Sequence, residues 1–154
     1  MRLRYWPNIR FRGVLFPILF AAPLVVMLAC GKEFVPKPVD IGADDTCLFC
    51  KKPISEKRYA AEFVTKDGFV RKFDDIACMV QHANKVKKTN IAAFFTTDYP
   101  SGTWVNAADA VYLRSDGFKK QVAGGILAYK DKTRAEGIAA QYKAELVKFE
   151  DILK

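Results

Sequence analysis

The segment KFDDIACMVQHA, residues 72–83, predicts the end of a β-strand followed directly by an amphipathic helix. Its acidic residues suit a helix N-terminus, and its apolar residues recur at helical spacing. Lysines in the residues that follow suit the helix end, so the helix is expected to continue to residue 88. Upstream of it, RYAAEFVT and FVRKF flank KDG, a pattern typical of a β-hairpin in which Gly68 takes a positive φ. These stretches together predict one β-β-α unit.

A second segment, AYKDKTRAEGIA at residues 128–139, repeats the order of strand end, acid and helix. The strands expected around it are IAAFFTT, AVYLRS and GGILAY, and the helix that opens at Asp131 is expected to continue to residue 146. The two segments predict an internal duplication. We therefore expect an α+β fold made of two β-β-α units around a mostly antiparallel sheet.

The first residues predict an exported protein. MRLRYWPNIRFRG holds four arginines and no acid, and the uncharged apolar run VLFPILFAAPLVVMLA ends at Cys30. This is the pattern of a lipoprotein signal peptide, residues 1–29, after which Cys30 is acylated and becomes the first residue. The alternative is an uncleaved membrane anchor, although about 16 apolar residues are few for a span of roughly 20. Both interpretations place the rest of the chain outside the cytoplasm, bound to a bacterial membrane and facing the periplasm or the cell exterior.

The composition after the signal peptide fits one small domain. Loss of the four signal arginines leaves 21 basic and 17 acidic residues, a net charge of +4, which is too mild to indicate nucleic-acid binding. Residues 30–45 contain two prolines and few periodic apolar residues, so we expect a lipidated tether. Residues 46–154 then predict a single folded domain.

Three of the four cysteines and the only histidine gather between residues 47 and 82. Cys47 and Cys50 form a C-x-x-C pair, and Cys78 and His82 are four residues apart, so they share one face of the expected helix. A loop facing that helix would supply three sulfurs and one imidazole. Such a Cys₃His set suits tetrahedral Zn²⁺ or soft Cu(I).

Other roles are open for the same residues. Cys47 and Cys50 could form a disulfide, Cys78 could pack as a small buried hydrophobe, and His82 could lie on the surface. Once Cys30 carries lipid, three thiols remain, and an odd number in an exported domain favours a ligand or reactive role.

The residues next to Cys78 also have two interpretations each. Asp74 and Asp75 are expected to cap the helix, with a bond from one of them to His82 as the alternative. Met79 is expected in the core, with metal ligation as the alternative.

The chain resembles the NosL family, the copper-binding lipoproteins that accompany nitrous oxide reductase. The resemblance runs in order through CLFCKKPI, YAAEFVTKDGFVRKFDDIACM, AVYLRS and AGGILAYKDKTRA, from Cys47 to about Ile152. It implies a Cu(I) carrier, not an enzyme, with a fold related to the organomercurial lyases. It also implies that copper goes to nitrous oxide reductase or to its copper-loading machinery.

The chain departs from the family pattern in its methionines. Lys51 and Lys52 follow the C-x-x-C pair where glycine and methionine are usual, and Val122 and Ala123 precede the later glycines where methionine is usual. With thiolates retained and thioethers lost, the site should discriminate less between Cu(I) and Zn²⁺. The two lysines are expected to lower the pKa of the neighbouring thiols.

Three functions of different classes follow from these patterns. The first is a copper chaperone, and the second is a structural zinc module with an interaction role elsewhere. The third is a thiol enzyme, either a C-x-x-C oxidoreductase or a carbon–mercury lyase that uses Cys78 and Asp75. The patterns also leave open a homodimer, and they do not decide whether it would share one metal.

Overall fold

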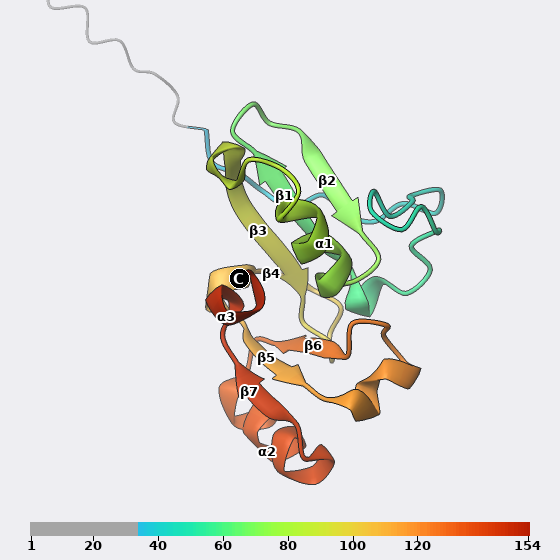
Figure 1. Cartoon of the computed structure of the whole chain (residues 1–154), viewed down its shortest axis with the longest axis vertical. Coiled ribbons are helices and arrows are strands. Elements are labelled where there is room, and N and C mark those ends of the chain that lie inside the picture. The colour runs from blue at the N-terminus through green and yellow to red at the C-terminus, as the bar shows by residue number, and fades with distance from the viewer. Residues whose placement is uncertain (1–33) are drawn as a thin grey trace, which may run out of the picture. The chain divides into compact units, whose positions relative to one another are not determined.

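The computed structural model describes residues 34–154, so the expected signal peptide and Cys30 lie outside the described part. The strands and helices are β1 (Ala61–Thr65), β2 (Val70–Phe73), α1 (Ile76–Ala83), β3 (Ile91–Thr97), β4 (Trp104–Asn106), β5 (Val111–Arg114), β6 (Ile126–Tyr129), α2 (Lys132–Tyr142), β7 (Glu145–Val147) and α3 (Phe149–Ile152) (Figure 1). Short 3₁₀ turns lie between them, at Lys57–Tyr59, Lys88–Asn90, Ala107–Asp109 and Asp116–Lys120. Within residues 34–154, no helix is long and apolar enough to cross a bilayer.

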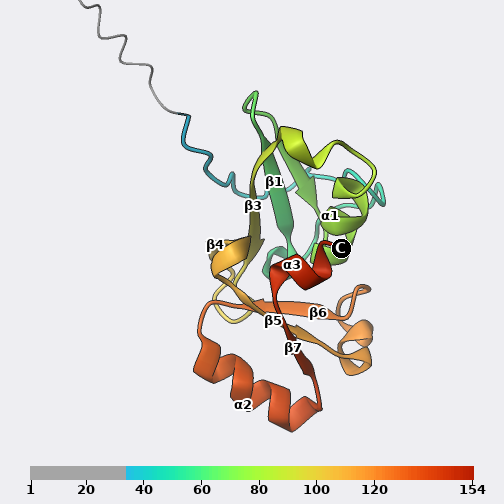
Figure 2. The same ribbon diagram turned by 60° about the vertical axis from the view of Figure 1, so that its left-hand side comes forward.

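The strands form two antiparallel sheets, which confirms the α+β class and the two β-β-α units. One sheet has the order β2-β1-β3-β4 and the other the order β6-β5-β7. Both β-β-α units are present, as β1-β2-α1 and β5-β6-α2 (Figures 1 and 2). The single sheet expected from the sequence is divided because β4 is short and the turn at Ala107–Asp109 redirects the chain before β5.

Two helices end earlier than their patterns predict. α1 ends at Ala83, and the lysines that follow lie outside it, with Lys85 in a turn and Lys88 at the start of the next 3₁₀ turn. α2 ends at Tyr142, because Lys143 takes a left-handed conformation (φ 49°) and the N–H of Ala144 donates to the carbonyl of Ala139. The residues expected as the last turn of this helix instead form β7, which pairs with β5.

The main core lies between the four-stranded sheet and α1. Residues of β1 alternate, so Ala61 and Phe63 share one face of the sheet and Glu62 and Val64 the other. Phe63 packs against Phe73 and Phe94 on the first face, and α1 covers this face with its four buried residues. Phe149 of α3 closes the same core through Phe94.

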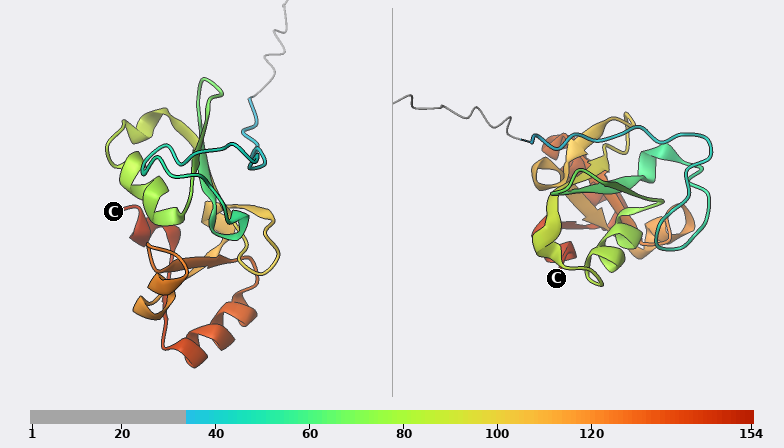
Figure 3. Two further views of the ribbon diagram at one scale, coloured as in Figure 1. Left: turned by 90° about the vertical axis from the view of Figure 1, so that its right-hand side faces the viewer. Right: turned by 90° about the horizontal axis from the view of Figure 1, so that it is seen from above.

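The chain before the first strand crosses the opposite face of that sheet. We call residues 38–45 the strap; seen from above, the strap and α1 lie on opposite sides of the sheet (Figure 3). The N–H of Val39 donates to Glu62 (2.9 Å), Lys72 Nζ donates to Asp45 (2.6 Å), and Ile41 is buried. The folded domain therefore begins before residue 46, where the sequence patterns placed its start.

The three-stranded sheet shares its two faces between two cores. Leu113 and Leu127 pack under α2, whose buried contacts are Ala135 and Ala139. Tyr112 points to the other face and joins the main core, and its hydroxyl donates to the carbonyl of Ala107 (2.8 Å). The β5-β6-α2 unit thus packs against the β1-β2-α1 unit through Tyr112.

Candidate metal centre

Cys47, Cys50 and Cys78 converge at one point. Their three Sγ atoms all lie within 4.8 Å of one another. Cys47 is fully buried, and the other two are partly exposed beside the main core. Sulfurs bound to one metal at about 2.3 Å lie roughly 4 Å apart, so only a small closure would bring this group onto an ion.

The C-x-x-C loop is held by its own backbone. The N–H of Cys47 donates to the carbonyl of Lys52 (2.8 Å), and the N–H of Lys51 donates to that of Cys47 (2.9 Å). Lys51 closes this turn with a φ of +64°, a conformation that favours glycine. The N–H of Cys50 points at Cys47 Sγ at 3.5 Å. The loop therefore presents both sulfurs to the same side.

Asp75 ties the first turn of α1 to a distant loop. It is the N-cap of α1, where its Oδ1 accepts the N–H of Cys78 (2.6 Å) and its Oδ2 accepts the N–H of Gly124 (3.2 Å). The sequence predicts the cap but not the bond to Gly124, because that contact joins residues 49 apart. Asp75 is buried, and both bonds are partly shielded from water. This arrangement fixes the position from which Cys78 projects.

Gly124 is a site residue that the sequence patterns did not single out for the metal centre. A Cβ at this position would overlap the Cβ of Ala77, the residue that precedes Cys78. The patterns assigned Gly124 and Gly125 to a tight turn, and Gly125 does take a positive φ of 63°. Gly124 instead allows close approach of two backbones. The glycine pair of AGGILAY is the signal from which this packing could have been suspected.

The thiols of Cys47 and Cys78 have pKa values that are shifted in opposite directions. Burial raises the pKa of Cys47, but hydrogen bonds from the backbone N–H groups of Asp74, Cys50 and Phe49 outweigh it and hold that pKa below its ordinary value. Burial, with the Asp75 charge, raises the pKa of the Cys78 thiol. Lys51 and Lys52 were expected to lower the pKa of the neighbouring thiols. At Cys47, backbone N–H groups lower the pKa instead.

Asp74 acts through its backbone and not as the helix cap. Its backbone N–H lowers the pKa of Cys47, while burial and the Asp75 charge raise the pKa of its own carboxyl. The N–H of Leu48 donates to the carbonyl of Lys72 (3.0 Å), which joins the end of β2 to the C-x-x-C loop. The loop is held on its other side by Lys85, whose Nζ lies 4.6 Å from the centre of the Phe49 ring.

His82 does not join the three cysteines. Its ring packs on the aromatic face of the sheet, with centroids 5.4 Å from Phe73 and 6.0 Å from Phe63. Burial, followed by the charge of Lys51 and other cations, lowers the pKa of His82 and so favours the neutral ring. Cys78 and His82 are one turn apart, and the aromatic contacts hold the imidazole against the strands. The Cys₃His set expected from the spacing is thus a set of three cysteines here.

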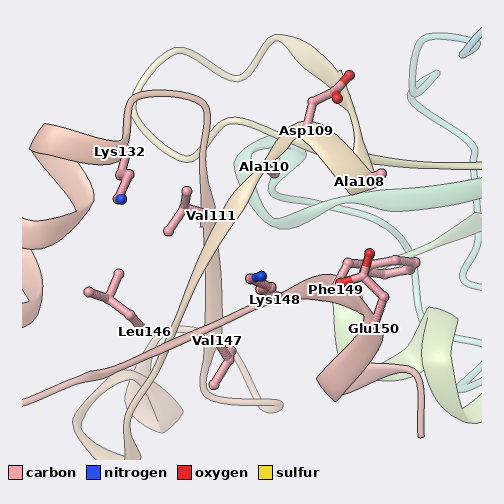
Figure 4. Close-up of a pocket in the computed structure, with 10 residues that line it drawn as sticks. All are labelled: Ala108, Asp109, Ala110, Val111, Lys132, Leu146, Val147, Lys148, Phe149 and Glu150. Carbon is pink, nitrogen blue, oxygen red and sulfur yellow. The ribbon is translucent and has the colours of Figure 1, made fainter.

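The remaining candidates lie elsewhere. Met79 is fully buried in the main core, and Cys30 lies outside the described residues. A separate pocket of about 560 Å³ is lined by charged and apolar side chains but by no cysteine or histidine (Figure 4). Among the described residues, the three cysteines are therefore the soft-ligand group.

Comparison with known proteins places this geometry in a family. The sequence signature of the NosL family matches residues 38–154, which is most of the chain. The chain belongs to the NosL family. Among solved structures, the NosL described as a copper chaperone from Shewanella denitrificans is similar, with a TM-score of 0.65 at 18% identity, over 75% of this chain and 95% of that one. A comparison with curated protein sequences gives no significant match.

The backbone at Lys51 bears on one departure from the pattern that the resemblance implies. Glycine is expected there from the resemblance, and Lys51 takes the left-handed conformation that glycine adopts without strain. The match also begins at residue 38, so it includes the strap.

Proposed function

We propose that this NosL-family protein is a copper chaperone that binds Cu(I) through Cys47, Cys50 and Cys78. The observation that carries the proposal is the approach of three sulfurs to within 4.8 Å of one another. Thiolate is a soft ligand that suits Cu(I), whereas structural zinc is almost always bound by four protein ligands. A three-sulfur site with Cys50 and Cys78 partly exposed leaves room for a ligand from a receiving protein.

The cellular role extends this proposal. We expect Cys30 to carry lipid, the domain to face the periplasm or the cell exterior, and copper to pass to nitrous oxide reductase or to its copper-loading machinery. The lipoprotein signal and the family support these expectations. Copper is cargo here, so the protein needs no catalytic residue of its own.

A structural zinc site is the second candidate. Cys47 is fully buried, and Cys50 and Cys78 pack against the main core, so a metal here would also join the loop to α1. A zinc clasp would use a fourth ligand and would be needed for folding. The chaperone instead requires a domain that stays folded without metal.

One experiment separates the two. The chain from Gly31 is prepared reduced and without air, and its Cu(I) affinity is measured against a calibrated chelator, with Cys78→Ser and His82→Ala as a matched pair. Because only Cys78 belongs to the sulfur group, we expect one Cu(I) per chain, a loss of about 100-fold or more in Cys78→Ser, and little change in His82→Ala.

The opposite result is equally clear. The chaperone is excluded if the protein holds one Zn²⁺ that Cu(I) does not displace and unfolds when that ion is removed. Loss of the metal in His82→Ala would show that the imidazole rotates off the aromatic face to complete a Cys₃His site.

A further inference from the structure

An apolar patch lies at the tip of the β1–β2 hairpin. We call Phe34, Val35 and Phe69 the hairpin patch; their exposed fractions are 50%, 65% and 57%. Phe34 rests on the turn, because a Cβ at Gly68 would lie 3.9 Å from Phe34 Cε2. The hairpin tip and α2 lie at opposite ends of the described domain (Figures 1 and 2).

One cationic side chain lies beside this patch, and others are close in the sequence. The guanidinium of Arg71 lies 5.4 Å from the centre of the Phe69 ring. Lys37 and Lys66 are exposed next to the patch residues in the sequence, as is one acid, Asp67. Exposed aromatic rings beside lysine and arginine are typical of surfaces that meet lipid headgroups, where the rings enter the interface and the charges stay with phosphate.

The length of the connecting chain decides what this patch meets. Only three residues separate Cys30 from Phe34, so their Cα atoms are at most about 14 Å apart even when the chain is fully extended. The closeness of the patch to the membrane rests on the proposed lipid anchor at Cys30. An acylated cysteine lies at the level of the headgroups, a layer roughly 5–8 Å deep on each side of the bilayer. The hairpin patch cannot then be far from the membrane.

We propose that Phe34, Val35 and Phe69 insert into the headgroup region of the membrane that anchors Cys30. The lipid and the patch are two contacts, so they orient the domain as well as retain it. β2 runs away from the tip to Asp74, whose N–H contacts Cys47. The five extended steps from Phe69 to Asp74 span about 17 Å, so the C-x-x-C loop beside the far end of β2 is held about that far from the hairpin tip. Cys50 and Cys78 are partly exposed there. Copper would be exchanged with a partner above the membrane surface.

The test places a fluorophore at the patch. The mature lipidated chain is reconstituted in vesicles of phosphatidylethanolamine and phosphatidylglycerol, with and without bromine in the acyl chains. Trp104→Phe removes the tryptophan of the domain, and Phe69→Trp adds one at the tip. Tyr142→Trp, at the end of α2 and 50% exposed, is the matched control. Val35→Trp is a second probe should Phe69→Trp disturb the hairpin.

We expect bromolipid to quench the fluorescence of the Phe69→Trp variant about twofold and that of the control by less than about a tenth. Equal quenching at both positions overturns the proposal and leaves the patch to a protein partner or a second copy. The intact mass of each sample reports the acyl chain, and its absence also overturns the inference. Cu(I) binding measured on the same samples is independent of both results, so failure here is distinct from failure of the chaperone proposal.

Discussion

The two halves of the described domain share one strand order but differ in chemistry. In both β2-β1-β3 and β6-β5-β7, the first strand is central and the strand after the helix lies on its far side. Both helices are capped by an aspartate, Asp75 and Asp131, placed two residues after an aromatic strand end. Only the first half holds cysteines, and Arg134 stands where Cys78 would be. The repeat thus supplies a scaffold, and the C-x-x-C loop adds the site.

The central strands show a second difference. Pairing of Ala61 with Phe73 and of Val111 with Tyr129 makes Glu62 and Tyr112 equivalent positions. Both are fully buried. The Tyr112 hydroxyl has a hydrogen-bond acceptor, whereas Glu62 Oε2 has no partner among the described residues. The buried hydroxyl of Tyr112 therefore has its hydrogen bond, whereas one carboxylate oxygen of Glu62 has none among the described residues, so the charge of Glu62 is costly to bury.

The largest expected effect concerns this pair. Burial raises the pKa of Glu62 to about 7. A carboxyl whose folded-state pKa is raised gives stability below its unfolded pKa near 4.5 and loses it as the pH rises to about 7. We expect the free energy of unfolding to fall by up to about 3 kcal/mol as the pH rises through this range. The Glu62→Gln variant should lack this pH dependence.

Urea unfolding between pH 4.5 and 8 checks this expectation. The difference between Glu62→Gln and the wild type isolates the carboxyl, because His82, with a lowered pKa, changes stability in the opposite direction over part of this range. Tyr112→Phe is the matched variant, with an expected cost of about 1 kcal/mol that does not vary with pH in this range. Parallel pH curves for Glu62→Gln and the wild type would contradict the prediction.

The next largest effect is the difference in stability between two glycine-to-alanine variants. In Gly124→Ala the new methyl group would overlap Ala77, so we expect a loss of about 2 kcal/mol of stability and weaker Cu(I) binding. Gly137 lies in α2 with nothing within 4 Å, so Gly137→Ala should stabilise by up to about 1 kcal/mol. Thermal unfolding of both variants gives the comparison. Equal shifts would mean that the loop and α1 move apart easily.

The helix caps should differ by less. Asp75→Ala loses a buried cap and the bond to Gly124, for an expected cost of about 2 kcal/mol, whereas the exposed cap at Asp131 should cost about 1 kcal/mol or less. Urea unfolding of the two alanine variants measures this. A larger loss at Asp131 would show that the second half, and not the metal end of the first, limits stability.

The smallest effect is at the C-x-x-C loop. Lys51→Gly removes a left-handed lysine and should stabilise by about 0.5–1 kcal/mol, as should Lys143→Gly at the end of α2. Lys52→Gly, where φ is not positive, should be neutral or destabilising. Differential scanning calorimetry resolves these signs. A destabilising Lys51→Gly would mean that the lysine side chain, and not the backbone, holds the loop.

Much of the fold was predictable from local patterns, and less of the site. The hairpin around Gly68 and the two capped helices follow from short-range spacing. The approach of Cys78 to the C-x-x-C pair was expected because the hairpin between them returns the chain to the loop. The position of His82 did not follow from spacing, because an i, i+4 spacing says which face two residues share but not that aromatic rings from other strands will hold one of them. The sequence patterns did not predict that the strap belongs to the folded domain, for a similar reason. Its few apolar residues show no periodicity, and its hydrogen bonds go to Glu62 and Lys72, far along the chain.

Local patterns specify the two β-β-α units, the C-x-x-C pair and Cys78 on a helix capped by acid, because these depend on residues close together in the chain. Long-range packing sets the division into two sheets, the contact of Gly124 with Ala77, the burial of Glu62 under the strap and the separation of His82 from the sulfurs. Each of these depends on how distant segments compete for the same space and the same hydrogen bonds. Local periodicity carries no record of that competition.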